Sequence, residues 1–324
     1  MSSDVRFSIV IPTYNRSGLL REVIEALIHQ EDPGCAYEII PVDNVSKDDT
    51  CQVVEELGQN SPVPIRYLYE PNPGSHYARN TGFKAAHGQI LGLIDDDIIV
   101  APDWVRKIVQ AYDNPGVSCA GSKITIRWIN GSPPKWFEPF KGVLGELDYG
   151  PDLIELHYPQ MIYAGNFSIR KEVLFRVGGY NPCNAPKDKL IGDGECGLCS
   201  KVYHLGGRIF WVPDAQAWHI QDAERITLAY MRRRAKYNGM SGAYSMYRKV
   251  NGDSFQILKM VSKRIVSTMY NIIRVLQYSN SREPRFYKHL YTYESNLGFI
   301  SYLIRIKTNH QLRDLVCRND WLNV

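Results

Sequence analysis

Gln89-Ile90-Leu91-Gly92-Leu93-Ile94-Asp95-Asp96-Asp97 is an apolar run that ends in three consecutive acids. The apolar residues predict a buried strand with the acids at its carboxyl end. Adjacent negative charges repel one another, and burial further disfavours the charged form. A divalent cation bound by Asp95–Asp97 and by substrate phosphates would relieve that conflict. A polar loop that caps the next helix, near Asp103, is the alternative.

Strands and amphipathic helices alternate through the first hundred residues. Strands are expected at 5–12, 37–42, 65–69 and 89–94. Such alternation predicts crossover units and a mostly parallel sheet flanked by helices. Ligands bind beyond the carboxyl ends of parallel strands. Tyr14-Asn15-Arg16, Asp43 and Asp95–Asp97 lie at those ends, so we expect them to converge on one cleft.

The composition describes a folded chain with room for one large domain or two ordinary ones. Hydrophobic residues make up 44% of the 324 residues and charged residues 22%. We find neither a signal-peptide pattern nor an apolar stretch of about 18 residues. Seven scattered cysteines favour a reducing compartment, and Cys196 and Cys199 lack the second pair of a zinc site. These features predict a cytoplasmic protein.

The net charge of +4 divides unevenly along the chain. Residues 1–224 carry 20 Lys and Arg against 29 Asp and Glu, whereas residues 225–324 carry 18 against 5. We expect an α/β domain over 1–224 and a basic helical region over 225–324. Residues 255–276 place apolar residues at helical spacing beside Lys and Arg, which suits an anionic membrane surface. A helical subdomain with a solvated basic face is the alternative, and no nucleic-acid partner is expected.

Short motifs occur in a definite order between residues 8 and 219. They are Ser8–Arg16, Val42–Thr50, Asn72–Gly82, Asp95–Asp97, Gly165–Lys171, Val177–Tyr180, Glu195–Lys201, Val212-Pro213 and Trp218-His219. In this order they resemble the family 2 glycosyltransferases, inverting enzymes of the GT-A fold. The resemblance implies that the chain moves a sugar from a nucleotide diphosphate donor to an acceptor hydroxyl, with a divalent metal.

The resemblance assigns the acidic strand end to the diphosphate of the donor. Asp97 is the expected ligand for Mn²⁺ or Mg²⁺, which would neutralise the leaving diphosphate. Asp95 is expected to contact ribose or the metal. Asp96 holds the variable position of the motif and is expected to face the protein within the nucleotide site. His219 resembles a histidine that occurs late in the sequences of this family and lies beside the metal. The alternative is a buried histidine that packs beside Trp218.

The segments after the first two strands are expected to bind the nucleotide. By resemblance, Asp43 accepts the ring N–H of the base, which favours a UDP-linked donor, and Arg79 lies nearby. The remaining nucleotide-binding set is Pro12, Thr13, Tyr14, Asn15 and Arg16.

The proposed general base lies where the chain departs from the family pattern. The usual Glu-Asp pair appears as Asp193-Gly194-Glu195, so a glycine separates the two acids. Glu195 keeps the spacing to Leu198 and Lys201, and we expect it to take the proton of the acceptor hydroxyl. Asp193 is the alternative base, and its structural interpretation is a helix cap.

Residues 127–160 are irregular and are expected to bind the acceptor, a saccharide or a lipid-linked glycan at the cytoplasmic membrane face. Trp128 and Trp136 could stack on an acceptor sugar or belong to the core. A non-catalytic nucleotide-sugar-binding or membrane-associated adaptor is an alternative, which the separated acids favour. A nucleotidyltransferase would need a glycine-rich basic loop, and Pro12–Arg16 is not one. A Rossmann dehydrogenase would need G-x-G-x-x-G after the first strand.

Overall fold

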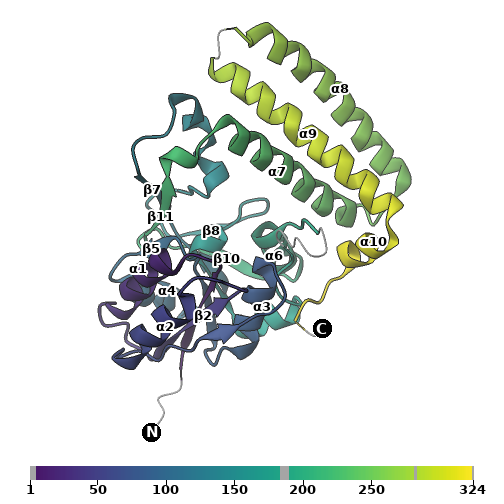
Figure 1. Cartoon of the computed structure of the whole chain (residues 1–324). Coiled ribbons are helices and arrows are strands. Elements are labelled where there is room, and N and C mark those ends of the chain that lie inside the picture. Colours follow the sequence, from purple (N-terminus) through teal and green to yellow (C-terminus); the bar gives the residue numbers. More distant parts are fainter. Residues whose placement is uncertain (1–4, 183–189, 281–282, 323–324) are drawn as a thin grey trace.

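The computed structural model of the protein describes residues 5–182, 190–280 and 283–322. An eight-stranded sheet runs through its lower body in the order β3-β2-β1-β4-β9-β6-β10-β8 (Figure 1). Its strands are β1 (Phe7–Thr13), β2 (Tyr37–Asp43), β3 (Leu68–Tyr69), β4 (Ile90–Leu93), β6 (Val117–Gly121), β8 (Ile154–Leu156), β9 (Phe167–Arg170) and β10 (Arg208–Trp211).

The first half of this sheet is parallel, as the alternation of elements predicts. Strand β1 pairs in parallel with β2 and with β4, and its last residue, Thr13, lies opposite Asp43. Strand β9 then runs antiparallel to both β4 and β6, which makes the whole sheet mixed. Because β1, β2 and β4 point the same way, their carboxyl ends meet at one edge.

Helices cover both faces of the sheet, and alternate residues of β1 point to opposite layers. Ile9 packs in the cluster that includes helices of the first face, whereas Val10 packs in the cluster of the second. The first face holds α1 (Ser17–Ile28), α2 (Thr50–Gln59) and α4 (Trp104–Ala111). The second face holds α3 (Ser75–Ala85), α5 (Lys171–Arg176) and α6 (Gly194–His204). Burial on both sides explains the continuous apolar run in β1.

A second, three-stranded sheet carries the segment that returns to the acidic triplet. Its strands are β5 (Ile98–Val100), β7 (Ile124–Ile129) and β11 (Ala217–Asp222), with β11 in the middle. His219 lies opposite Ile98, and the Ile220 amide donates to the carbonyl of Asp97 at 2.8 Å. This pairing brings residue 219 beside residue 97. Short helices η1 (Lys135–Leu144), η2 (Ala164–Asn166) and η3 (Ala223–Arg225) connect these parts.

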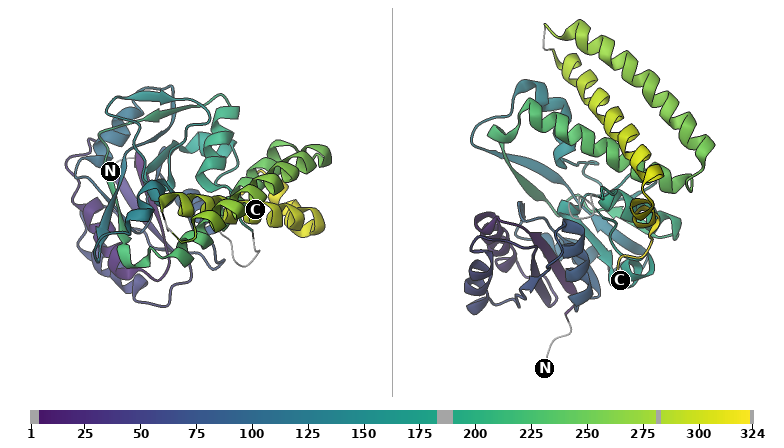
Figure 2. Two further views of the ribbon diagram at one scale, coloured as in Figure 1. Left: turned by 90° about the horizontal axis from the view of Figure 1, so that it is seen from above. Right: turned by 45° about the vertical axis from the view of Figure 1, so that its right-hand side comes forward.

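The C-terminal region is helical, as expected. It consists of α7 (Leu228–Lys249), α8 (Ser254–Tyr278), α9 (Pro284–Thr308) and α10 (His310–Cys317). Figures 1 and 2 show α9 between α7 and α8, with α8 outermost and far from the sheet. The core of this region gathers buried aromatic residues, among them Tyr244, Phe299 and Tyr302. Across the described residues, every helix is too short or too polar to cross a bilayer.

Candidate active site

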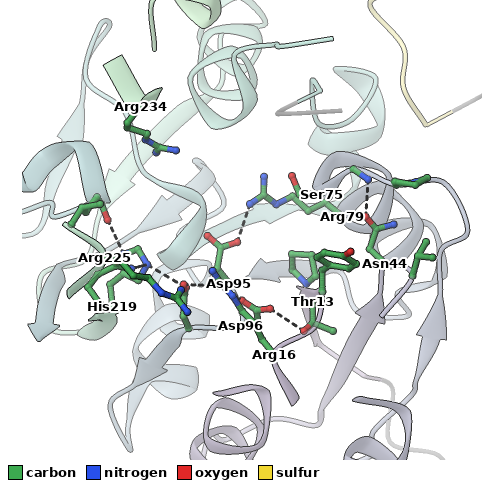
Figure 3. A pocket seen from close by; sticks show the side chains of 18 of the residues that line it. Thr13, Arg16, Asn44, Ser75, Arg79, Asp95, Asp96, His219, Arg225 and Arg234 are labelled. Carbon is green, nitrogen blue, oxygen red and sulfur yellow. Dashed lines mark hydrogen bonds and ion pairs between the residues drawn. The ribbon is translucent and has the colours of Figure 1, made fainter. Parts of the chain in front are cut away.

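A cavity of about 750 Å³ opens at the carboxyl ends of β1, β2 and β4. It is lined by residues from six parts of the chain, and Figure 3 shows side chains from several of them converging. The predicted residues that line it are Pro12, Thr13, Tyr14, Arg16, Arg79, Asp95, Asp96, Asp97 and His219. The structure therefore brings most of the predicted nucleotide and metal residues to one place. Asp43 and Asn15 lie next to residues that line it.

The three acids of the triplet make three different sets of contacts. Asp95 accepts a hydrogen bond from Arg79 at 2.8 Å. Asp96 accepts from the Thr13 hydroxyl at 2.9 Å and from Arg16 at 2.8 Å, and burial raises its pKa to about 6. Asp96 thus faces the protein, on the side of β1. The hydrogen bonds from Thr13 and Arg16 hold the Asp96 carboxyl in one orientation, and its burial makes the charged form less favourable.

Asp97 lies between the side chains of Arg16 and His219. One of its oxygens accepts from Arg16 at 2.7 Å, and the other lies 3.2 Å from His219 Nε2. Burial alone would raise the pKa of Asp97, but the hydrogen bonds and charges of His219 and Arg16 outweigh it, so its pKa lies below the ordinary value. Asp97 is therefore a buried carboxylate in its charged form, which a metal ligand must be.

The Asp97 and His219 side chains fit a divalent cation. His219 Nδ1 lies 2.7 Å from the carbonyl oxygen of Leu144, and Nε2 faces Asp97. Burial would lower the pKa of His219, but the hydrogen bond and charge of Asp97 raise it overall, so a cation bound at Nε2 would displace a proton. A ring nitrogen anchored on a carbonyl is the usual arrangement of a metal-binding histidine. Among the residues that the structure describes, no third His, Cys, Asp or Glu completes a cluster. Phosphate oxygens and waters normally supply the rest around Mg²⁺ and similar ions.

Two loops at one side of the cavity, those after β1 and β2, hold each other in place. The Asn15 amide donates to Ser46 Oγ at 2.9 Å, and Asn15 Oδ1 accepts from the Lys47 amide at 2.7 Å. Asn15 and Val45 both have positive φ, which is a costly conformation for the β-branched Val45. Backbone strain of this kind is retained mainly at functional sites.

Asp43 is buried beneath these loops. Its two oxygens accept hydrogen bonds from the Ser46 amide and the Tyr67 hydroxyl, both at 2.8 Å. The next residues, Asn44 and Val45, line the cavity in its place. Asn44 also accepts from the Gly74 amide at 2.7 Å, which ties the loop to the start of α3.

The two acids of Asp193-Gly194-Glu195 have different surroundings. Asp193 is buried, and its oxygens accept from Asn181 and Ser245, both at 2.8 Å. Burial raises the pKa of Asp193. Glu195 is half-buried in the first turn of α6, and one oxygen accepts from the Tyr180 hydroxyl at 2.6 Å. Asp193 is committed to holding α6 against α7, whereas Glu195 is more accessible.

A chain of contacts joins the acidic triplet to Glu195. Arg79 bonds Asp95, and its guanidinium lies over the ring of Tyr180 at 4.8 Å from the centroid. The hydroxyl of the same tyrosine donates to Glu195. Arg79 and Tyr180 therefore fix the acidic triplet and Glu195 relative to each other.

Trp128 and Trp136 do not line this cavity. Trp136 stacks on Tyr287 of α9 with ring centroids 4.5 Å apart, and Trp128 meets Phe137 edge-on. Both tryptophans pack against an aromatic cluster between η1, α7 and α9. This packing favours the core alternative, and sequence spacing cannot show it because Tyr287 lies on the distant helix α9.

Several residues that line the cavity were not predicted. They are Asn44, Ser75, Leu144, Gln221, Arg225, Tyr230 and Arg234. Arg225 precedes α7 and Arg234 lies on it, so the basic C-terminal region contributes cations to the cavity (Figure 3). The charge asymmetry was the available signal, but it was interpreted only as a surface property.

A sequence model of Glycosyl transferase family 2 matches residues 8–180, more than half of the chain. The chain belongs to this family. It is 24% identical over 280 residues to the glucosyl-dolichyl phosphate glucuronosyltransferase of Haloferax volcanii, covering 83% of the chain and 87% of that protein. It is also 31% identical over 182 residues to the dolichol-phosphate mannosyltransferase of Pyrococcus furiosus, covering 52% of the chain and 47% of that protein.

Solved structures share the fold of this family 2 chain. The mannosyltransferase PcManGT of Pyrobaculum calidifontis, solved with GDP-Man and Mn²⁺, matches 96% of the chain and 79% of its own at a TM-score of 0.54 and 18% identity. S. aureus TarS 1-349, solved with UDP, matches 90% of the chain and 91% of its own, with a TM-score of 0.51 and 17% identity. These similarities confirm the predicted GT-A fold with its helical C-terminal region.

Proposed function

We propose that this glycosyltransferase moves a sugar, with inversion, from a nucleotide diphosphate donor to the hydroxyl of a glycoconjugate acceptor. The observation that carries the proposal is the convergence of Asp97, His219 and Arg16 at one wall of the cavity. Glu195 does not line the cavity itself, but Tyr180 and Arg79 connect it to the acidic triplet. The residues of 1–224 would form the catalytic domain, and those of 225–324 a helical region that completes its cavity.

Charge on the leaving diphosphate is the main problem that the site must solve. A bound Mn²⁺ or Mg²⁺ would neutralise part of it as a Lewis acid. Asp97 and His219 would hold that ion, with Asp95 beside it. Arg16, Arg225 and Arg234 line the same cavity and would add hydrogen bonds to phosphate oxygens.

Glu195 is our choice for the general base. One of its oxygens is held by Tyr180, which fixes the carboxylate so that the other can accept the proton of the attacking hydroxyl. Asp193 is a poorer choice because both its oxygens already hold Asn181 and Ser245 in a buried place. Attack from the side of Glu195, opposite the leaving diphosphate, would invert the anomeric carbon.

We infer a UDP-linked donor first on the family resemblance alone, which assigns Asp43 to the ring N–H of the base. In the structure the Ser46 amide and the Tyr67 hydroxyl hold the two oxygens of Asp43, so a base would have to replace one of them. Two sequence relatives support a lipid-linked acceptor, since one is named a glucosyl-dolichyl phosphate glucuronosyltransferase and the other a dolichol-phosphate mannosyltransferase. An enzyme with that acceptor would work as a peripheral protein at the cytoplasmic face of a membrane.

The test is nucleotide release across a panel of UDP-, TDP- and GDP-sugars with Mn²⁺. Glu195→Gln should lower turnover by about 10²-fold or more, the usual contribution of a general base. Asp97→Asn should lower it as well and weaken the response to Mn²⁺. Glu22→Gln is the matched control, because Glu22 is exposed on α1, outside the cavity. Unchanged turnover in Glu195→Gln and Asp97→Asn would refute the assigned roles, and donor binding without turnover would favour an adaptor.

A further inference from the structure

Helix α8 carries a continuous apolar face that points away from the rest of the described chain. Its side chains are each at least 41% exposed: Phe255, Leu258, Ile265, Val266, Met269, Ile272, Ile273 and Leu276. Figures 1 and 2 show why, since α8 is the outermost layer of the helical region. An exposed apolar face of this length usually marks an interaction site.

The orientation of α8 is fixed by its other face. Ile257 and Asn271 are buried against α9, and Asn271 Oδ1 lies 2.8 Å from His289 Nδ1. Arg264 donates to Asn296 Oδ1 at 2.8 Å. These polar contacts specify which side of α8 meets α9, so a rotation of α8 cannot bury the apolar face.

The charges of α8 are all of one sign. The helix contains Lys259, Lys263, Arg264 and Arg274 and no Asp or Glu. Lys259 and Lys263 are exposed beside the apolar stripe, and neither forms an ion pair with another described residue. An apolar face with basic residues at its edge complements a bilayer that contains anionic phospholipid.

A second copy of the chain fits the same face less well. The positions 255, 258, 265, 269, 272 and 276 follow the spacing of a coiled-coil seam. Val266 and Ile273 widen that seam to a broader stripe, which is typical of contact with an extended apolar surface. Two α8 helices would also bring Lys259 and Lys263 of each copy to the edge of the interface, with no acid on either helix to pair with them.

We propose that the outer face of α8 lies in the interfacial layer of an anionic phospholipid bilayer and tethers the catalytic cavity to it. The helix would lie flat, with Phe255 and Leu276 at the two ends of the buried stripe and the lysines at the headgroups. The physiological reason for such a tether rests on the proposed lipid-linked acceptor, but the binding itself does not.

Flotation of the full chain with vesicles tests this proposal. Wild type should float with vesicles of equal parts phosphatidylcholine and phosphatidylglycerol, and salt should weaken the binding. Leu258→Ser with Leu276→Ser should weaken it about tenfold or more, because each loses a large apolar side chain. Leu153→Ser with Tyr158→Ser is the matched control, since these residues are similarly exposed (65% and 58%, against 67% and 69%) but lie far from α8 in the sequence and fold.

A charge variant distinguishes binding to anionic lipid from nonspecific hydrophobic adsorption. Lys259→Gln with Lys263→Gln should weaken binding to anionic vesicles about 30-fold, at about 1 kcal/mol for each lysine, and leave the far-UV circular dichroism unchanged. Equal binding by wild type and the α8 variants would overturn the proposal, as would a dimer that the Leu258 and Leu276 changes dissolve. Donor turnover in solution is measured in parallel. Retained turnover without vesicle binding refutes only the tether, and vesicle binding without turnover refutes only the proposed reaction.

Discussion

Replacing Gly239 by alanine should destabilise the protein, because α7 and α9 cross in direct backbone contact there. A Cβ atom at Gly239 would lie 1.9 Å from the Ser295 carbonyl oxygen of α9. The opposing Gly298 has the same relation to the Lys236 carbonyl oxygen, at 2.1 Å. The two glycines let the helices approach more closely than any larger side chain allows.

The magnitude follows from that distance. Carbon and carbonyl oxygen in contact lie about 3.3 Å apart, so the helices must separate by about 1.4 Å at this point. Overpacking of this kind costs about 1–3 kcal/mol, and alanine returns about 1 kcal/mol of helix propensity. Contacts along the rest of the crossing also weaken as the helices move apart. We expect a net loss of about 2 kcal/mol in the free energy of unfolding.

Gly242 supplies the matched control. It lies one turn further along α7, and a Cβ there would meet the Phe299 ring at 3.7 Å, an ordinary contact. Gly242→Ala should therefore stabilise the protein by up to about 1 kcal/mol. Urea unfolding followed by circular dichroism measures both variants. If Gly239→Ala is as stable as Gly242→Ala, the close crossing of α7 and α9 is wrong, and so is the position of the α7 residues that line the cavity.

Three further outcomes are expected. Tyr180→Phe should lower kcat about tenfold with little change in the donor KM, since it removes only a charge-assisted hydrogen bond to Glu195; steady-state kinetics would contradict this if KM alone changed. Chelation should abolish turnover and Mn²⁺ restore it, with His219→Ala needing about 10–100-fold more metal; turnover that survives chelation argues against the metal site. Glu38→Gln should cost about 3 kcal/mol at neutral pH. Burial would raise the pKa of Glu38, but hydrogen bonds from Ser8, the His87 amide and Arg66 lower it overall. Its contribution is therefore present above about pH 4.5 and lost as the pH falls through the lowered value, and urea unfolding at several pH values should show the wild type and variant converging in acid.

The edge of the sheet that carries the cavity was predictable from short stretches of sequence. An apolar run, a turn and an amphipathic helix are local patterns, and parallel strands necessarily end at the same edge. The resemblance added His219, which no local pattern joins to Asp97. Contacts between distant segments decided the rest: Asp193 is a buried acceptor because Ser245 of α7 and Asn181 both donate to it.

The role of the C-terminal region shows the same division. Its helices and its basic charge follow from composition and spacing alone. That Arg225 and Arg234 line the cavity does not, because it depends on where α7 packs against the catalytic body. The aromatic residues near 128–137 likewise became packing residues only when α9 covered them.

Helix α8 shows most clearly how far the sequence alone can predict the packing. Its sequence contains two apolar seams of nearly the same spacing, one through Ile257 and Val261 and one through Leu258 and Ile265. Periodicity by itself determined that this segment is a two-sided amphipathic helix beside basic residues. Only the tertiary structure decided which seam is covered, because the hydrogen bonds to His289 and Asn296 exist on α9 alone. The acidic triplet is the opposite case, since its strand, its edge and its charge were all determined by nine consecutive residues.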